Sequence, residues 1–290
     1  MLAILGGLGA ALCWATASMA SARAARRIGP WSTLAWAMLI GLVLTTPLML
    51  IGGGSVHLGP RELALLAVSG TSNVVGLLLA YAAVQRGQVA LVAPIISTEG
   101  AIGASIAVAA GEPLAAGAAV VLAAIVLGIV LTSVERRAPS LLSAPGERPA
   151  LGRSRTAVLL AVGAAVLFGV NLYVSGRIGT ELPLAWAILP ARVAGTLAVA
   201  LPLLLTRRLR MTREALPFVV VIAVVEVLGV ASYAFGARDG IAVASVVSSQ
   251  FGAIAAIVSV GLFGERLDRL QSAGVVLIVA GVGVLSALQS

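Results

Sequence analysis

Three ionisable side chains interrupt long apolar stretches of this sequence: Glu99, Arg192 and Glu226. Each lies near the middle of a run of about 20 apolar residues, the length that crosses a bilayer as a helix. An ionised side chain at the bilayer centre costs about 2.5–3.5 kcal/mol on insertion scales, so such residues persist mainly where they face a cavity or a partner. We therefore interpret the three as candidate substrate-binding or coupling residues.

Two amide side chains, Asn73 and Gln250, lie at a similar depth in two further runs. Polar groups from several helices that meet at one depth are typical of the midplane binding site of a transporter. In this interpretation Arg192 pairs with Glu226 of the adjacent run, and Glu99 is left without a fixed counter-charge. The five residues together form the predicted site.

The chemistry of this predicted site stays open at the level of sequence. Burial favours the protonated form of an unpaired carboxyl group, so Glu99 could carry a proton or hold a substrate amine. Arg192 could instead hold a substrate carboxylate or phosphate. The structural alternative is a buried ion pair, a neutral glutamate bonded to a serine, and amides that only bridge helices.

Aromatic residues are scarce, at 4 % of the chain. Tyr233 follows Glu226 by seven residues, two helical turns along the same face, and could form a gate above the site. Tyr81 is a second candidate gate, although both tyrosines also suit an interfacial aromatic belt. Trp14 and Asn171 are weaker candidates for the pocket wall.

The composition defines the class of protein. Of 290 residues, 60 % are hydrophobic and only 10 % are charged, whereas a soluble domain carries about 25 % charge. These values exclude an ordinary cytosolic enzyme, a disordered chain and a nucleic-acid-binding domain. They predict an all-α membrane protein with ten transmembrane helices. The predicted spans cover about residues 2–22, 31–51, 62–85, 88–110, 114–133, 156–176, 183–205, 215–237, 241–262 and 270–288.

A Pro- and Arg-rich segment, residues 135–155, divides the chain into five-span halves at 1–134 and 156–290. Its composition predicts an extended linker. The halves are related at a constant offset of 152: Tyr81, Arg86, Ala90, Ser97, Gly100 and Ile102 recur as Tyr233, Arg238, Ala242, Ser249, Gly252 and Ile254. Because each half has an odd number of spans, the second half enters the membrane from the opposite side. Such inverted repeats are typical of secondary transporters.

Arginine placement predicts the orientation in the membrane. All 19 basic residues are arginine; fifteen follow odd-numbered spans, three follow even-numbered spans, and Arg192 lies within a span. Loops rich in arginine face the cytoplasm. This count predicts that both termini lie outside the cytoplasm.

Two Gly–Glu pairs, Gly111–Glu112 and Gly264–Glu265, follow the fourth and ninth predicted spans. We interpret both pairs as structural, because glycine ends helices in the left-handed conformation and glutamate interacts favourably with the start of the next helix. With the five-plus-five organisation, the Gly- and Ala-rich final spans and the Val92–Ala93–Pro94–Ile95 start of the fourth span, the chain resembles the EamA-type transporters of the drug/metabolite transporter superfamily. The resemblance extends over essentially the whole chain.

The resemblance implies an inner-membrane transporter of metabolites or drugs that works by alternating access, commonly as an exporter. It also implies cytoplasmic termini, the reverse of the arginine count. We therefore expect a secondary transporter, an exporter of a small polar metabolite or drug, with proton coupling as a further hypothesis. The alternatives are a flippase or subunit that handles a lipid-linked intermediate, and a structural or sensory membrane protein.

The expected partners are a small-molecule substrate, membrane lipids and protons, with no nucleic acid. The sequence carries no motif for catalysis, and no enzyme activity or cofactor is expected. One cysteine and one histidine offer no cluster of metal ligands, so no metal site is expected either. The sequence does not indicate an oligomeric state.

Overall fold

The computed structural model describes residues 1–52, 56, 58–86, 92, 95–114, 117–133, 151–251, 254 and 269–288, and over these residues it contains helices and no strand. The helices of the first half are α1 (Leu2–Ile28), α2 (Pro30–Gly52), α3 (Pro60–Arg86), α5 (Glu99–Ala109) and α6 (Ala118–Ser133). Those of the second half are α7 (Leu151–Glu181), α8 (Leu184–Gly195), α9 (Leu201–Leu205), α10 (Leu216–Gly236), α11 (Ile241–Ser248) and α13 (Arg269–Leu288). A π-helical turn, η1 (Thr196–Ala200), joins α8 to α9.

Within the described part of the chain, six helical segments are long and apolar enough to cross a membrane: Leu2–Ile28, Pro30–Gly52, Pro60–Arg86, Arg155–Glu181, Leu184–Leu205 and Leu216–Gly236. The prediction of a helical membrane protein is therefore confirmed. Each of the ten predicted spans contains at least one described helix, but α5, α6 and α11 are shorter than their predicted spans. The count of ten crossings stays a prediction.

Several helix boundaries differ from those expected from hydropathy, among them both ends of α7 and the end of α1. The helix α7 begins at Leu151, so the last five residues of the predicted linker are helical, and α1 continues to Ile28. Both extensions contain alanine, arginine or leucine, which favour helix although arginine lowers hydropathy. Hydropathy therefore predicts the apolar part of each helix, and helix propensity extends the helix beyond it. The linker residues 135–150 lie outside the described residues.

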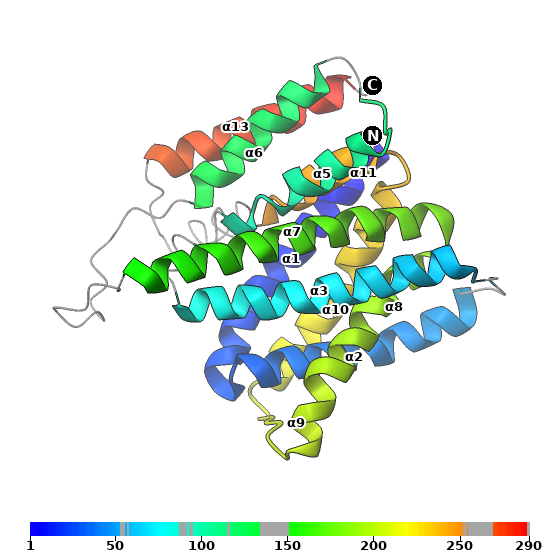
Figure 1. Cartoon of the computed structure of the whole chain (residues 1–290), viewed down its shortest axis with the longest axis vertical. Coiled ribbons are helices and arrows are strands. Elements are labelled where there is room, and N and C mark those ends of the chain that lie inside the picture. Colours follow the sequence, from blue (N-terminus) through cyan, green and yellow to red (C-terminus); the bar gives the residue numbers. More distant parts are fainter. Residues whose placement is uncertain are drawn as a thin grey trace.

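The helices pack mainly against helices of the other half of the chain (Figure 1). The most extensive contacts pair α1 with α10 and α3 with α7, followed by α6 with α13 and α5 with α11. The pair α6 and α13 lies side by side at the upper edge of Figure 1. The helix α1 corresponds in the repeat to α7, and α10 corresponds to α3. The contact of α1 with α10 therefore has the contact of α7 with α3 as its counterpart.

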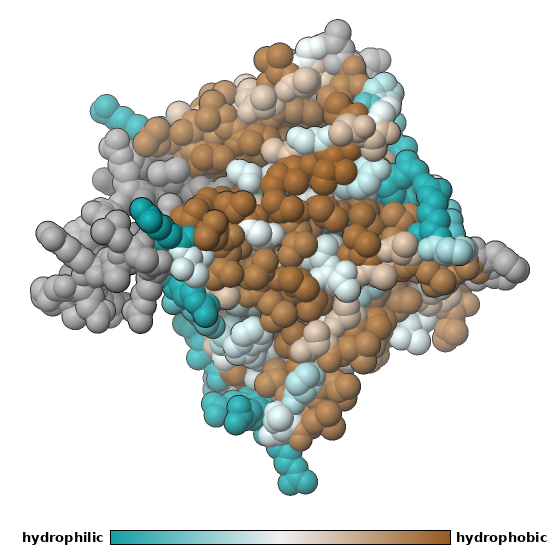
Figure 2. Space-filling model, viewed as in Figure 1, coloured by the Kyte–Doolittle hydropathy of each residue, from teal (hydrophilic) through white to brown (hydrophobic). Residues whose placement is uncertain are grey.

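The exterior of the molecule is apolar, and much of the interior is lined by small residues. On the face shown in Figure 2, hydrophobic residues cover most of the surface and strongly hydrophilic residues gather at its edges. Large side chains such as Val43, Leu50 and Leu159 are exposed, whereas alanines dominate the buried positions of α1. Small residues let helix backbones approach closely, and an apolar exterior suits contact with lipid.

Candidate functional site

One cavity between the helices contains most of the residues that were predicted to form a site. Its volume is about 360 Å³, and its wall comes mainly from α1, α2, α3, α7, α8 and α10. All three ionisable residues of the predicted site line this cavity: Glu99, Arg192 and Glu226. One of its two amide residues, Asn73, lines the cavity as well. Gln250 is not part of the wall, although its neighbour Phe251 is.

Arg192 and Glu226 form an ion pair at the cavity wall. The Arg192 Nη2 donates to Glu226 Oε2 at 3.1 Å, with 1 % of the arginine side chain and 32 % of the glutamate side chain exposed. The carboxylate is thus on the open side of the pair and the guanidinium on the packed side. The predicted pairing of these two residues is present, and it neutralises a charge that would be costly to bury alone.

The helix α2 holds the Arg192 side chain from its other side. The Arg192 Nη1 donates to the sulfur of Met38 at 3.5 Å. A Cβ atom at Gly41 would lie 2.9 Å from Arg192 Cδ, so the arginine stem packs directly against the α2 backbone. Met38 and Gly41 therefore set the position of the guanidinium, and neither residue was predicted.

Glu99 occupies the first position of α5, directly after a turn that interrupts the fourth predicted span. This turn is closed at Thr98, whose backbone N–H and hydroxyl both donate to the carbonyl of Ile95, at 3.2 and 2.7 Å. The Glu99 side chain is buried but lines the cavity. It makes no hydrogen bond or ion pair with any residue of the described part of the chain.

A matching interruption occurs in the ninth predicted span, at Ser249 and Gln250. The Gln250 N–H donates to Val247 O at 3.4 Å, and the Ser249 hydroxyl donates to Val246 O at 2.9 Å. At the offset of 152 residues this turn coincides with the turn before Glu99, and Phe251 takes the place of the glutamate. The buried Gln250 Nε2 has no hydrogen-bond partner among the described residues.

The helix interruptions were not predicted, although the sequence contains a signal for them. Hydroxyl side chains that bond to their own backbone compete with regular helix geometry. Adjacent hydroxyl residues, Ser97–Thr98 and Ser248–Ser249, stand at both interruptions. The same pattern also occurs at Thr45–Thr46 and Thr71–Ser72, inside the uninterrupted helices α2 and α3, so paired hydroxyl residues alone do not locate the turns.

The amide of Asn171 is fixed by two serines. Its Oδ1 accepts hydrogen bonds from Ser69 at 3.1 Å and from Ser175 at 3.3 Å, and the two hydroxyls also lie 3.1 Å apart. Because both bonds go to the amide oxygen, the amide nitrogen remains a donor at the cavity wall. Asn73 also lines the cavity, and its buried Oδ1 has no partner within the described residues.

The two candidate gate tyrosines are placed differently. Tyr81 lines the cavity and its ring lies 5.4 Å from that of Trp31. Tyr233 is not in the wall; it is buried, donates to Leu172 O at 2.7 Å and lies 2.9 Å from the Ser245 hydroxyl. The candidate pocket residue Trp14 lines the cavity, and its ring centroid lies 6.3 Å from that of Tyr233.

Glu112 links the two halves of the chain outside this cavity. Its carboxylate accepts hydrogen bonds from the backbone N–H groups of Ile241 and Ala242 at 3.1 and 2.9 Å. Gly111 has φ +95°, the left-handed conformation expected of it. The glutamate, however, caps α11 of the other half and not the helix that follows it, because the chain reverses there and brings its loop over the start of α11. The pair Gly264–Glu265 lies outside the described residues.

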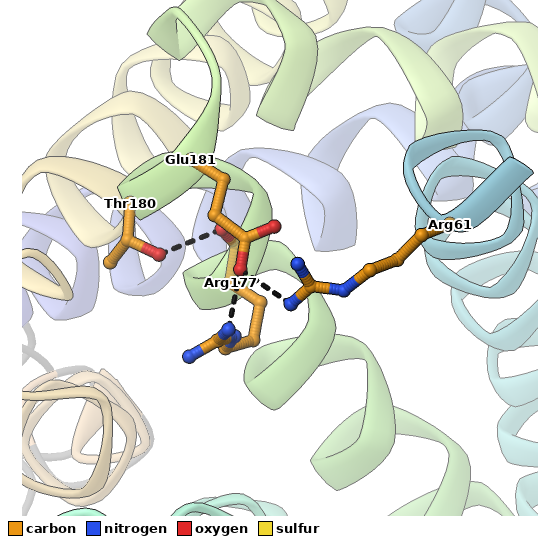
Figure 3. Close-up of polar contacts among 4 residues, drawn as sticks. All are labelled: Arg61, Arg177, Thr180 and Glu181. Carbon is orange, nitrogen blue, oxygen red and sulfur yellow. Dashed lines mark hydrogen bonds and ion pairs between the residues drawn. The ribbon is translucent and has the colours of Figure 1, made fainter. Parts of the chain in front are cut away.

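A second pocket, of about 370 Å³, lies where α7 and α10 end. Its charged groups already have partners: Glu112 caps α11, Arg238 donates to Gly179 O at 2.8 Å, and Arg177 pairs with Glu181. Figure 3 shows that Glu181 also forms an ion pair with Arg61 of α3. These ion pairs connect the start of α3 to the end of α7. We therefore place the candidate site in the central cavity.

Comparison with known proteins indicates the family and the fold of the chain. Residues 1–134 and 155–287 match the model of the EamA-like transporter family. The chain aligns with a protein of known crystal structure over 99 % of this chain and 96 % of the other. The TM-score is 0.79 and 19 % of the residues are identical, which shows that the two proteins share a fold. No curated protein is similar to the chain in sequence.

Proposed function

We propose that this chain, which belongs to the EamA-like transporter family, is a secondary transporter that exports a small polar metabolite or drug across the inner membrane by alternating access. The observation that carries the proposal is the meeting of Glu99, Arg192 and Glu226 in one cavity. Ionisable residues inside a membrane protein that face a common cavity are typical of a substrate or ion pathway.

The way the helices pair supports alternating access. Inverted repeats allow one arrangement of the halves to open a central site to one side of the membrane and its mirror arrangement to open it to the other. In this chain the helix pair α1–α10 is the repeat counterpart of the pair α7–α3. The two helix interruptions also lie at equivalent positions of the two halves. We propose ten spans in two inverted repeats on this basis.

Glu99 is the proposed coupling residue. A buried carboxyl group without a counter-charge is stable when it binds either a proton or a cation. A proton that enters from one side and leaves on the other would make transport dependent on the pH gradient. Glu226 is less suited to this role because Arg192 already neutralises it.

The test is flux in proteoliposomes that contain the purified protein, across a panel of metabolites and drugs, with and without an imposed pH gradient. We expect accumulation of at least one compound to depend on the protein and to increase with the gradient. Glu99→Gln is expected to remove the effect of the gradient, because the amide cannot release a proton.

The matched control is Glu214→Gln, since Glu214 is 81 % exposed and is not part of the cavity wall. Flux through this variant should equal that of the wild type. If the flux is the same with and without the pH gradient, and is unchanged by Glu99→Gln, proton coupling is contradicted. Absence of protein-dependent flux for every compound of the panel would remove transport itself.

A further inference from the structure

The central cavity has an unequal set of charges. Its described charged residues are Glu99, Glu226 and Arg192, so the two carboxylates and one guanidinium leave an excess of one negative charge when all are ionised. The sequence left open whether Arg192 binds a substrate anion or Glu99 binds a substrate amine. The contacts of each residue separate these two cases.

Arg192 is not available to a substrate anion. Only 1 % of its side chain is exposed, one Nη atom is bonded to Glu226 and the other to the sulfur of Met38. The stem is packed against Gly41, and the remaining donor, Nε, is buried and has no partner among the described residues. An anionic ligand would have to displace Glu226, leaving that carboxylate without its counter-charge.

Glu99 has the opposite environment. Its carboxyl group faces the cavity without a partner in the described part of the chain. Because the site around it is desolvated, the ionised form requires a cation at this position. A positively charged ligand would therefore have a favourable electrostatic interaction with Glu99 that a neutral or negative ligand lacks.

Much of the remaining wall is apolar, although the amides of Asn73 and Asn171 also line it. Trp14, Phe168 and Phe251 contribute aromatic surfaces, and Leu77, Ile96 and Ile222 contribute aliphatic ones. Aromatic faces also attract cations, including quaternary ammonium groups. A cavity of about 360 Å³ is within the range of sites for small organic molecules.

We infer that the substrate is a monovalent organic cation, an amine or quaternary ammonium compound with an apolar body, whose charged group lies against Glu99. This inference rests on the proposed transport function and assigns its substrate class. Arg192 is a positioning residue, which keeps Glu226 neutralised so that a single negative charge remains for the ligand.

The test uses three probes that share one ring and differ in charge: benzyltrimethylammonium, benzyl alcohol and phenylacetate. Purified protein is assayed for ligand-induced thermal stabilisation and, in proteoliposomes, for competition with a compound already shown to be transported. We expect benzyltrimethylammonium to stabilise and compete at least about tenfold more effectively than the other two. Glu99→Gln should remove this preference, and Glu99→Asp should retain part of it, because the carboxylate remains.

The three-probe comparison on the wild-type protein decides the matter even if a Glu99 variant does not fold. Preference for phenylacetate, or equal effects of benzyl alcohol and the cation, would overturn the cation assignment while transport itself stands. A preference for the cation that is unchanged in Glu99→Gln would also overturn the assignment. So would the result that none of the three probes competes with a compound that the protein transports. Absence of any transported compound would instead overturn the proposed function.

Discussion

Arg192 shows how a single side chain depends on both halves of the chain. Met38 and Gly41 come from α2 in the first half, whereas Glu226 comes from α10 in the second. A relative movement of the two halves therefore changes the surroundings of the guanidinium. The ion pair is consequently a sensitive point at which to test the site by substitution.

Gly41→Ala is expected to impair transport without removing any polar group. The new methyl would lie 2.9 Å from Arg192 Cδ, so the arginine would have to shift from its present position in the ion pair with Glu226. Small misplacements of a positioned group can lower rates by about tenfold or more, and we expect a loss of flux of that size. Gly52→Ala on the same helix is the control, since a Cβ atom there meets nothing within 4 Å. Equal flux through the two variants would contradict the role of Gly41.

Glu226→Gln is expected to destabilise the protein, because it leaves Arg192 buried beside a neutral group. Breaking a buried pair costs about 3–5 kcal/mol, and we expect about 1–3 kcal/mol here since the glutamate is 32 % exposed and water screens the pair. Equilibrium unfolding in detergent measures the change. The double variant Arg192→Gln/Glu226→Gln should lose less than the sum of the two single variants. Simple additivity would show that the pair contributes no coupling energy.

Individual polar residues could be predicted because a charge in an apolar run is visible at a single position. Four of the five predicted site residues, Gln250 being the exception, line the cavity. Met38 and Gly41 could not be predicted, since methionine and glycine are common in membrane helices. Their importance arises only from the packing of α2 against α8, which no local pattern reveals.

At the scale of elements, the carboxylate of Glu112 joins the loop after α5 to the first turn of α11. This contact connects segments from different halves and satisfies two backbone donors that would otherwise lack an acceptor. Residues at helix starts commonly satisfy such donors from within the same segment. Because the donors belong to the other half, the contact stabilises one arrangement of the halves.

Glu112→Ala is expected to lower the free energy of unfolding by about 1–2 kcal/mol, as is typical when a helix loses its cap. Glu112→Gln should cost less, about 0.5–1 kcal/mol, because the amide oxygen still accepts a bond but the charge at the helix start is gone. Thermal and denaturant unfolding of the purified protein measure both values. Glu214→Ala serves as the exposed control, and indistinguishable results for the two alanine variants would argue against the cap.

The elements themselves were predictable where apolar length and helix propensity agree. The long helices α2, α3 and α10 lie close to their predicted spans, and Pro30 and Pro60 begin two of them, since proline suits the first helical position. The turns before Glu99 and Phe251 were missed because hydropathy averages over about 20 residues and does not detect a two-residue interruption. Helix pairing across the halves was inferable only from the repeat.

For the whole molecule, the arginine count predicts which side of the membrane each end of the bundle faces. We test this with single cysteines in a Cys13→Ala background, at Arg61 and at Arg213, both exposed and at opposite ends of the bundle. A membrane-impermeant maleimide should label Arg61→Cys in intact cells and Arg213→Cys only after permeabilisation. The reverse pattern would place both termini in the cytoplasm.

The pairing of α1 with α10 has a consequence for biogenesis. The ribosome completes α1 at Ile28, but its most extensive partner ends at Gly236. At synthesis rates of about 5–20 residues per second, roughly 10–40 s separate the two events. During that interval the alanine-rich face of α1 lacks its main partner and has α2 against only part of it. The nascent chain is therefore most exposed to misassembly and quality-control proteolysis before its second half has entered the bilayer.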